Sequence, residues 1–492
     1  MNKRSLWIGA SLALAAAFAL AGCGTTYYFD GRTLPPSGLV NRVLIAIQNP
    51  SSLTSGALEI VDAYYDERSN YNGTPAYFSI TGFNGSLPTT IQSMPEEQYA
   101  AVYGSGDGTL SRISYAEERA LGSVSGLNGF SSSVFITRTG SYVFAANQAT
   151  HLLTVVNQAG GTSAALGLPN VFRVSVNPGG SVALAFVQNS PYVYYPIQLS
   201  SAQTLAYAGG SATWPKAAID CEPQNAPSWC LFQMQSPDNH YVDAAGVTQY
   251  YGAPLSFDHP TKAVFSSDGS TAYILSCGPE CSGTSSGYTA APVAPMLFLQ
   301  GQASGLLPTT SALANATVAI PGGATNALVS SSTMYVVGQQ PQQVNGQTLF
   351  GGHLTVVNLA SNTITGSASI SDGTPGVRSR MIQADDNTLW VAMAGCTTGV
   401  RYATSAAGGY GCLTMFDTSK NSVTMIEPYI GDATGIAAVT GLHKIYTVEG
   451  GQVYIYSTVN GSAMNNEFVT VTGTASDVAY MDAITDANNT VY

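Results

Sequence analysis

The chain has 492 residues, of which 28 are acidic, 16 are basic and only 9% are charged. Its 28 Tyr and 52 Gly, with many Val, Thr and Ser, favour an all-β protein over a helical one. The formal net charge of −12 repels phosphate backbones, so we expect no nucleic-acid partner.

The N-terminal 22 residues have the pattern of an export signal. Lys3 and Arg4 are followed by an apolar run from Leu6 to Ala19, which is shorter than the roughly 20 residues of a membrane-spanning helix. The segment ends in Leu20-Ala21-Gly22-Cys23. This ending resembles the lipobox of bacterial lipoproteins. An ordinary signal peptide with an incidental cysteine is the alternative.

The lipoprotein resemblance implies cleavage after residue 22 and acylation of Cys23, which would attach the chain to a membrane through its N-terminal lipid. Gly24 stands where the family's inner-membrane retention signal has Asp, which implies the outer membrane, on either face. Residues 23–41, rich in Gly, Ser and Pro, are predicted to form a tether. Cleavage would leave 16 − 2 = 14 basic residues and a net charge of 14 − 28 = −14.

The six remaining cysteines fall into three pairs of neighbours. Because each pair lies in one apparent loop of an exported chain, we predict the disulfides Cys221–Cys230, Cys277–Cys281 and Cys396–Cys412. The alternative is a metal site, but no histidine lies near any pair.

Short strands in groups of four occupy the rest of the chain. Opening strands are predicted near residues 90, 133, 172, 263, 325, 379, 435 and 477. The first group, which begins with Arg42 to Gln48, lacks its opening strand, whereas the last group is little more than an opening strand, Asp477 to Ala483. Together the two incomplete ends form one sheet. This predicts a ring-closed β-propeller of eight four-stranded antiparallel blades, with seven blades or a linear solenoid as alternatives.

A single propeller domain is therefore predicted over residues 42–492. Within the unit that opens near residue 172, the fourth strand is expected at Thr204 to Ala208. Loop insertions are expected near residues 209–258, 277–293, 339–350 and 396–412.

Several segments resemble the repeats of YVTN-type propellers. They are Phe265 to Tyr273, Phe172 to Leu184, Leu354 to Val377 and Leu413 to Thr418. The Asp-Gly of this phrase favours a hairpin turn, and its Asn or Asp favours a local bond from side chain to backbone. The resemblance implies an exported or surface binding scaffold, in a family where many members have no assigned activity.

No catalytic signature emerges from the sequence. The five histidines form no HExxH motif, and Gly104 to Gly108 lies in a hairpin instead of before a helix. Paired acidic residues on turns make calcium a minor possibility; otherwise no cofactor and no metal site are predicted.

The aromatic residues near residues 209–258 are the strongest binding candidates. We predict that Trp214, Trp229, Tyr241, Tyr250 and Tyr251 form an exposed face, with a small core beneath a long loop as the alternative. The function expected is a non-catalytic envelope scaffold that binds protein or glycan. A lactonase-like hydrolase with its site at the propeller axis and a structural subunit of a surface assembly are the alternatives.

Overall fold

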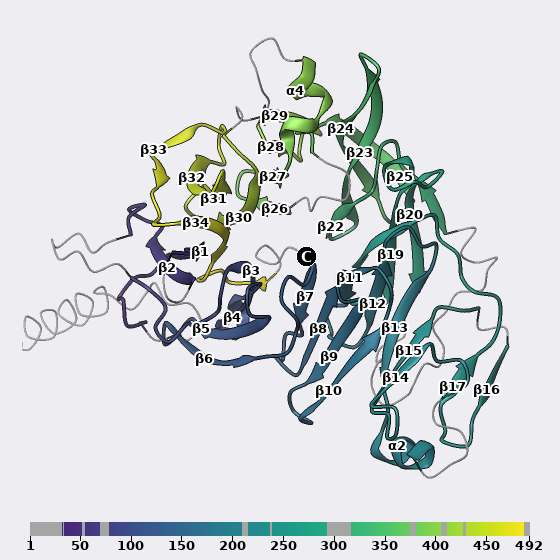
Figure 1. Cartoon of the computed structure of the whole chain (residues 1–492). Helices are drawn as coiled ribbons and strands as arrows, with labels where there is room; N and C mark the ends of the chain where they lie inside the picture. Colours follow the sequence, from purple (N-terminus) through teal and green to yellow (C-terminus); the bar gives the residue numbers. More distant parts are fainter. Residues whose placement is uncertain are drawn as a thin grey trace, which may run out of the picture.

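The structure, a computed structural model, is a ring of eight antiparallel β-sheets whose innermost strands face a common centre (Figure 1). The described residues are 32, 34–51, 55–68, 78–208, 215–236, 239–292, 316–373, 380–404, 411–426 and 430–486. The eight-bladed propeller predicted from the repeats is confirmed, and all eight predicted opening strands are the inner strands of blades.

The two ends of the ring close within one blade. Strand β1 (Arg42–Gln48) pairs antiparallel with β34 (Thr474–Tyr480) on one side and with β2 (Gly56–Asp62) on the other. A bridge between Glu59 and Ser79 extends this sheet outward. The predicted closure is therefore confirmed, with β34 supplying the inner strand of the first blade.

The regular blades follow one order, from the inner strand outward. Blades 2 and 3 are β3 (Pro88–Met94), β4 (Tyr99–Gly104), β5 (Thr109–Ser114) and β6 (Arg119–Val124), then β7 (Ser133–Ile136), β8 (Tyr142–Asn147), β9 (Leu152–Asn157) and β10 (Thr162–Gly167). Blades 5 and 6 are β18 (Pro260–Phe265), β19 (Thr271–Cys277), β20 (Ser286–Pro292) and β21 (Thr317–Ala319), then β22 (Asn326–Ser330), β23 (Thr333–Val344), β24 (Gln347–Asn358) and β25 (Thr363–Ser369). Blades 7 and 8 are β26 (Arg380–Ala384), β27 (Thr388–Ala392), β28 (Leu413–Asp417) and β29 (Ser422–Ile426), then β30 (Ala433–Val439), β31 (Lys444–Glu449), β32 (Gln452–Ser457) and β33 (Ala463–Val469).

Blade 4 departs from the prediction at its outer edge. It consists of β11 (Val171–Val176), β12 (Ala183–Val187), β13 (Val193–Gln198), β15 (Trp229–Gln233) and β14 (Asp220–Glu222). The strand expected at Thr204 to Ala208 is wrong, because those residues belong to helix α2 (Ser201–Ala208). Ser200 begins the helix with a capping box: its Oγ accepts from the Gln203 N–H at 3.3 Å, and Gln203 Oε1 accepts from the Ser200 N–H at 2.8 Å.

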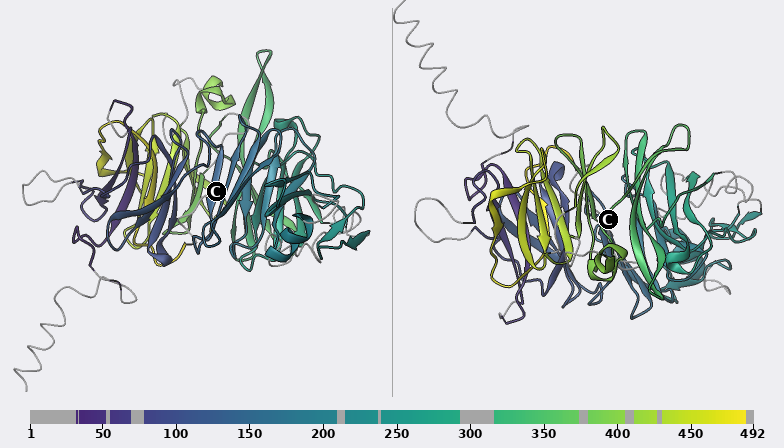
Figure 2. Two further views of the ribbon diagram at one scale, coloured as in Figure 1. Left: turned by 60° about the horizontal axis from the view of Figure 1, so that its bottom comes forward. Right: turned by 90° about the horizontal axis from the view of Figure 1, so that it is seen from above.

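The insertions also take regular forms. Residues 339–350, expected as a loop, are the tip of a hairpin in which β23 and β24 each run for 12 residues. This hairpin and α4 (Val400–Thr404) stand out from the ring (Figures 1 and 2), and Phe350 forms a bridge with Gly399. The remaining short elements are η2 (Pro95–Glu97), η3 (Gly278–Cys281), η4 (Cys396–Thr398), β16 (His240–Val242) and β17 (Thr248–Tyr250).

The core lies between blades, because each sheet presents one apolar face to each neighbour. The described residues form eight buried apolar clusters, one at each interface between consecutive blades. Between blades 7 and 8, for example, Trp390 packs against Tyr456 with ring centroids 6.2 Å apart. No blade completes its core alone, so the ring stabilises itself only when closed.

The turn residues of the repeats act as the sequence predicts. The Asp268 carboxylate accepts from the Ser270 N–H at 3.0 Å in the hairpin between β18 and β19. Asn358 and Asp417 make equivalent bonds to the backbone two residues ahead, at 2.9 Å each. These bonds fix the hairpins locally and leave the sheet faces for packing.

All three predicted disulfides are present: Cys221–Cys230, Cys277–Cys281 and Cys396–Cys412. The first joins neighbouring residues of β14 and β15, and the other two fix connections between the second and third strands of their blades. Disulfides are typical of proteins that fold outside the cytoplasm. Among the described helices, none is long and apolar enough to cross a membrane.

Candidate functional site

Two adjoining cavities lie where the inner strands of the blades begin. The smaller, of about 540 Å³, is bordered by the starts of β7, β11, β18 and β22, and we call it the Arg173 cavity. The larger, of about 950 Å³, is bordered by the starts of β3, β26, β30 and β34, and we call it the Arg380 cavity. Ser131 borders one and Ser132 the other, so both cavities open on the same face of the ring.

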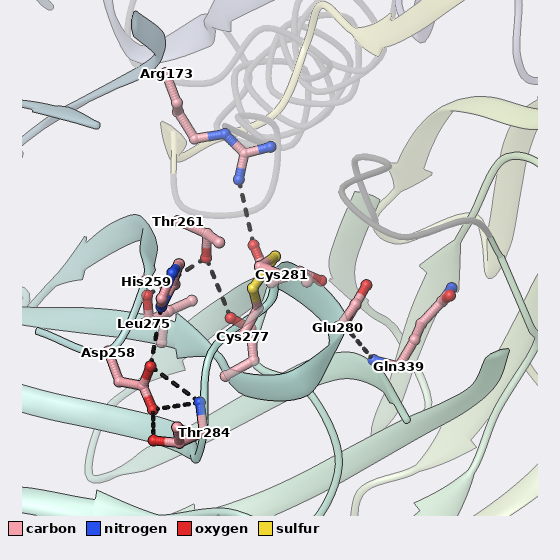
Figure 3. Close-up of a disulfide and its surroundings, with 12 residues drawn as sticks. Arg173, Asp258, His259, Thr261, Leu275, Cys277, Glu280, Cys281, Thr284 and Gln339 are labelled. Atoms are coloured by element: carbon pink, nitrogen blue, oxygen red, sulfur yellow. Dashed lines mark hydrogen bonds and ion pairs between the residues drawn. A yellow bond between two sulfur atoms is a disulfide. The ribbon is translucent and has the colours of Figure 1, made fainter. Parts of the chain in front are cut away.

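Arg173 is the third residue of β11, and its guanidinium lines the smaller cavity. Figure 3 shows the Arg173 side chain extending towards the connection that contains Cys281. Nη1 of Arg173 donates to the Thr325 carbonyl at 3.3 Å, and its Cζ lies 5.7 Å from the centroid of the Phe172 ring. Surrounding protein lowers the pKa of Arg173 to about 10 by desolvation, so the side chain stays charged at neutral pH. Among the described residues, Arg173 has no ion-pair partner.

One wall of the Arg173 cavity is the connection between β19 and β20, which contains η3 and the Cys277–Cys281 disulfide (Figure 3). Asp258 fixes this connection by accepting hydrogen bonds from the N–H groups of Thr284 at 2.9 Å and Ser285 at 2.6 Å. It also contacts Nδ1 of His259, a lining residue, at 3.0 Å. The wall is thus tied to the strand that follows Asp258.

The pKa of Asp258 reflects these bonds. Burial alone would raise it, but hydrogen bonds from Thr284, His259 and Ser285 outweigh burial and hold the pKa well below the ordinary value of 3.8. Asp258 is therefore a carboxylate at neutral pH, and the wall depends on its charge.

Glu280 is the one carboxylate residue among the described residues that line the Arg173 cavity. Its Oε2 accepts from the backbone N–H of Gln339 in blade 6 at 3.1 Å (Figure 3). A Cβ on Gly323 would lie 2.2 Å from the same oxygen, so the glycine leaves room for this carboxylate. Glu280 thus links blades 5 and 6.

Part of the remaining lining of the Arg173 cavity is neutral and polar. Gln148 donates to Gln188 at the rim. Thr261 Oγ1 donates to the Ala324 carbonyl at 3.2 Å, which ties β18 to blade 6. Gln188, Asn189 and Ser282 are exposed at the opening, with side chains that can bond a bound molecule. The cavity thus combines the Arg173 guanidinium and the Phe172 ring with several amide and hydroxyl groups and with the apolar side chains of Val187 and Pro260.

The Arg380 cavity is lined differently. Its arginine is already neutralised, because Nη2 of Arg380 lies 3.0 Å from Oδ2 of Asp477, a fully buried carboxylate of β34. Asp432 at the rim accepts from the Gly395 N–H at 2.7 Å. Most other lining residues are Thr, Ser, Gly and Ala. This cavity is wide and polar but offers no cation without a partner among its described residues.

A third cavity, of about 880 Å³, lies away from the centre, beside the closure blade. Tyr64 and Tyr65 border it, each 58% exposed, with their rings edge-to-face at 4.9 Å. Residues 37–41, which lead into β1, form part of its wall. Its position beside the closure blade separates it from the two cavities at the centre of the ring.

The five predicted binding aromatics do not gather at one surface. Trp214 lies outside the described residues. Trp229 is fully buried in β15, where it contacts Tyr142 and Phe144 of blade 3, and Tyr250 is 6% exposed, so neither contributes to an exposed face. Of the four that the structure describes, Tyr241 and Tyr251 are exposed; their rings lie 5.9 Å apart at the β16–β17 hairpin, at the outer edge of the ring (Figure 1).

Sequence reasoning missed Arg173, although a signal existed. Only 9% of the chain is charged, and Arg173 interrupts the apolar run Val171–Val176 at the start of a predicted inner strand. A charge in such a position predicts either a buried ion pair or a ligand contact. Cys23, the predicted lipidation site, lies outside the described residues.

The acidic pairs considered for calcium have other partners in the structure. Glu96 and Glu97 contact Arg138, and Asp386 contacts His443 at 2.9 Å. Glu118 and Asp482 both contact Arg42, at 3.0 and 2.6 Å. Among the described residues, no group of three or more His, Cys, Asp or Glu side chains is placed to hold a metal ion. The expectation of no cofactor, with calcium as a minor possibility, stays a prediction.

No protein-family model matches the chain, and no curated protein matches it in sequence. Solved structures are similar at low identity. Dihydro-heme d1 dehydrogenase NirN in complex with DHE is 9% identical with a TM-score of 0.46, over 94% of this chain and 78% of its own. Apo AztD from Citrobacter koseri is 10% identical with a TM-score of 0.44, over 89% and 96%. The β-propeller domain of Myceliophteria thermophila Cps50 (Swd1) is 10% identical with a TM-score of 0.42, over 75% and 96%.

Proposed function

We propose that this protein is an exported, lipid-anchored β-propeller that binds a glycan of the cell envelope, without transforming it, at the Arg173 cavity. The observation that supports this most is the composition of that cavity: Gln148, Gln188, Asn189 and Ser282 surround an opening with Phe172 and Arg173 at its side. Amides and hydroxyls match the hydroxyl groups of a sugar, and an aromatic ring packs against its C–H face.

The size of the cavity favours a glycan over a folded protein partner. A hollow of about 540 Å³ holds a small ligand, whereas stable protein interfaces need about 800 Å² on each partner. The exposed Tyr241 and Tyr251 lie on the outer hairpin, so a protein partner would contact a different surface.

The N-terminal sequence and the disulfides support the proposed localisation. We propose that residues 1–22 are removed and that acylated Cys23 holds the YVTN-like propeller at the outer membrane. Three disulfides support an oxidising compartment. Replacing Cys23→Ala should abolish palmitate labelling and release the chain from the membrane fraction; unchanged labelling would refute the anchor.

A glycan array with the full-length chain tests the binding function. We expect binding to a subset of envelope saccharides, lost in the double variant Gln188→Ala and Asn189→Ala. The control is Tyr241→Ala with Tyr251→Ala, which removes the exposed aromatics and should leave binding unchanged. The reverse pattern would place the binding surface on the outer hairpin, and cleavage of a bound saccharide would establish the hydrolase alternative.

The long hairpin supports assembly as a second candidate function. Strands β23 and β24 extend beyond the length of their neighbours β22 and β25, and the residues at their tip are mostly exposed. Projecting hairpins offer edges and side chains for contact with other chains. Analytical ultracentrifugation of the full-length chain, compared with a variant in which residues 341–349 are replaced by a two-residue turn, tests this role; equal monomeric behaviour of both would refute self-assembly.

A further inference from the structure

Arg173 is half-buried and differs in its partners from Arg42, Arg68 and Arg380. Arg42 contacts Asp482 and Glu118, Arg380 contacts Asp477, and Arg68 contacts Glu59 at 2.7 Å. Arg173 has five N–H donors, of which the described structure uses one, on the Thr325 carbonyl. A charge that is enclosed by protein without a counter-charge is costly unless a bound anion supplies one.

The surroundings of Arg173 select the charge of that anion. A phosphate group carries about 1.5 to 2 negative charges at neutral pH, whereas Arg173 is the one arginine or lysine among the described residues that line the cavity. A carboxylate carries a single charge, and its two oxygens match the planar fork of a guanidinium.

The rest of the lining indicates what kind of molecule carries the carboxylate. Asn189 and Ser282 at the opening, with the rim pair Gln148 and Gln188, present amide and hydroxyl groups beside the apolar side chains of Val187 and Pro260. Such groups suit a polyhydroxylated molecule and give little to a fatty acid.

We infer that the ligand of the Arg173 cavity is an acidic saccharide, a uronic acid or a glycan ending in one, whose carboxylate binds the guanidinium of Arg173. This inference rests on the proposed function and narrows its ligand class. Phe172 would pack against the sugar ring, while Gln188, Asn189 and Ser282 would bond its hydroxyls. No covalent step is involved.

Calorimetric titration of the full-length chain with a glucuronate-containing disaccharide and with its uncharged methyl ester tests the inference on the unaltered protein. We expect the acid to bind at least tenfold more tightly than the ester, which is about the contribution of one charge-assisted hydrogen bond. Equal affinity for acid and ester would overturn the inference. Acetate or inorganic phosphate binding as tightly as the disaccharide would overturn it too, because either would show a simple anion site.

The variant Arg173→Gln should lower affinity for the acid at least tenfold and leave affinity for the ester nearly unchanged. Arg173→Lys keeps the charge but loses the planar fork of the guanidinium, so its affinity for the acid should lie between those of the wild type and Arg173→Gln. The matched control is Arg112→Gln: Arg112 also lies over an aromatic ring, 4.2 Å from the centroid of Tyr99, but is exposed on β5 in blade 2. Thermal unfolding of each variant verifies that it is folded.

The outcomes separate the inference from the proposed function. If neutral glycans bind, depend on Gln188 and Asn189, and ignore Arg173, the charge assignment is wrong and the glycan function stands. If no acidic or neutral saccharide binds, both are overturned.

Discussion

Arg380 of blade 7 reaches past blade 8 to form an ion pair with Asp477 of the closure blade, with Nη2 and Oδ2 3.0 Å apart. Gly435 of β30 lies between them, and a Cβ there would come within 2.7 Å of Oδ1 of Asp477. The same carboxylate accepts from the backbone N–H of Ile91 in blade 2, at 2.8 Å. One side chain thus connects blades on both sides of the point where the ring closes.

Replacing Asp477→Asn should therefore destabilise the protein strongly. Removing one member of a buried ion pair leaves the other charge enclosed and costs about 3 to 5 kcal/mol. Guanidinium unfolding at pH 7 measures the change. Glu117→Gln is the control, because Glu117 and Arg119 form an exposed pair and such pairs contribute less than about 1 kcal/mol. Equal losses in the two variants would show that the buried pair does not hold the ring closed.

The wall of the Arg173 cavity should weaken in acid. The pKa of Asp258 is lower in the folded protein than its ordinary value of 3.8, so its contribution to stability is fully present above that pH and is lost as the pH falls below it. Thermal unfolding of the wild type and of Asp258→Asn measures this contribution to stability. The measurements run from about pH 7 to about pH 2.5, because carboxylates titrate in this range. The wild type should be more stable at pH 7, and the difference should shrink at the acid end. A difference that stays constant with pH would contradict the role of the charge.

The segment that leads into blade 6 should not tolerate a side chain at Gly338. A Cβ at Gly338 would lie 1.7 Å from the carbonyl oxygen of Gly323, the residue that also makes room for Glu280. Gly338→Ala should cost roughly 2 to 4 kcal/mol, because the backbone has to shift to remove the overlap. Gly122→Ala is the matched control, since Gly122 also lies in a strand, β6, and has open space around it. Urea unfolding should show a change within about 0.5 kcal/mol for the control.

The two disulfides near the cavities should differ in their effect on stability. Cys396 and Cys412 are 16 residues apart, whereas Cys277 and Cys281 are 4 apart. On loop-closure entropy, replacing the first pair by serine should cost about 3 kcal/mol and replacing the second about 2 kcal/mol. Chemical unfolding measures both. The Cys277–Cys281 disulfide borders the Arg173 cavity, so its loss should reduce saccharide affinity more than loss of Cys396–Cys412 does, although it costs less stability. A larger loss of affinity on removing Cys396–Cys412 would show that η3 does not shape the site.

Much of the architecture could be predicted because it depends on local sequence patterns. Each inner strand is a short apolar run bounded by turn residues such as Asp268 and Asn358, whose side chains bond the backbone two residues ahead. The missing opening strand at Arg42 and the surplus one at Asp477 reveal the closure. The cysteine pairs are close in sequence, which limits their choice of partner.

Blade 4 shows where local pattern was insufficient. Both Thr204 to Ala208 and Trp229 to Gln233 could have paired with β13, and the structure pairs it with Trp229 to Gln233. Trp229 fills the interface with blade 3. Thr204 to Ala208 instead form a helix, which Ser200 and Gln203 cap. The same packing removes Trp229 and Tyr250 from the surface on which they were expected.

The sequence by itself determined the all-β class, the number of blades, the joining of the two ends and the cysteine pairing, because each depends on neighbours along the chain or on the count of repeats. Only the tertiary structure decided which charges are neutralised. Asp477 lies 97 residues from Arg380 and binds it, whereas Arg173 meets a carbonyl 152 residues away and no carboxylate among the described residues. Charge pairing depends on distance in space between blades, which no spacing along the chain records.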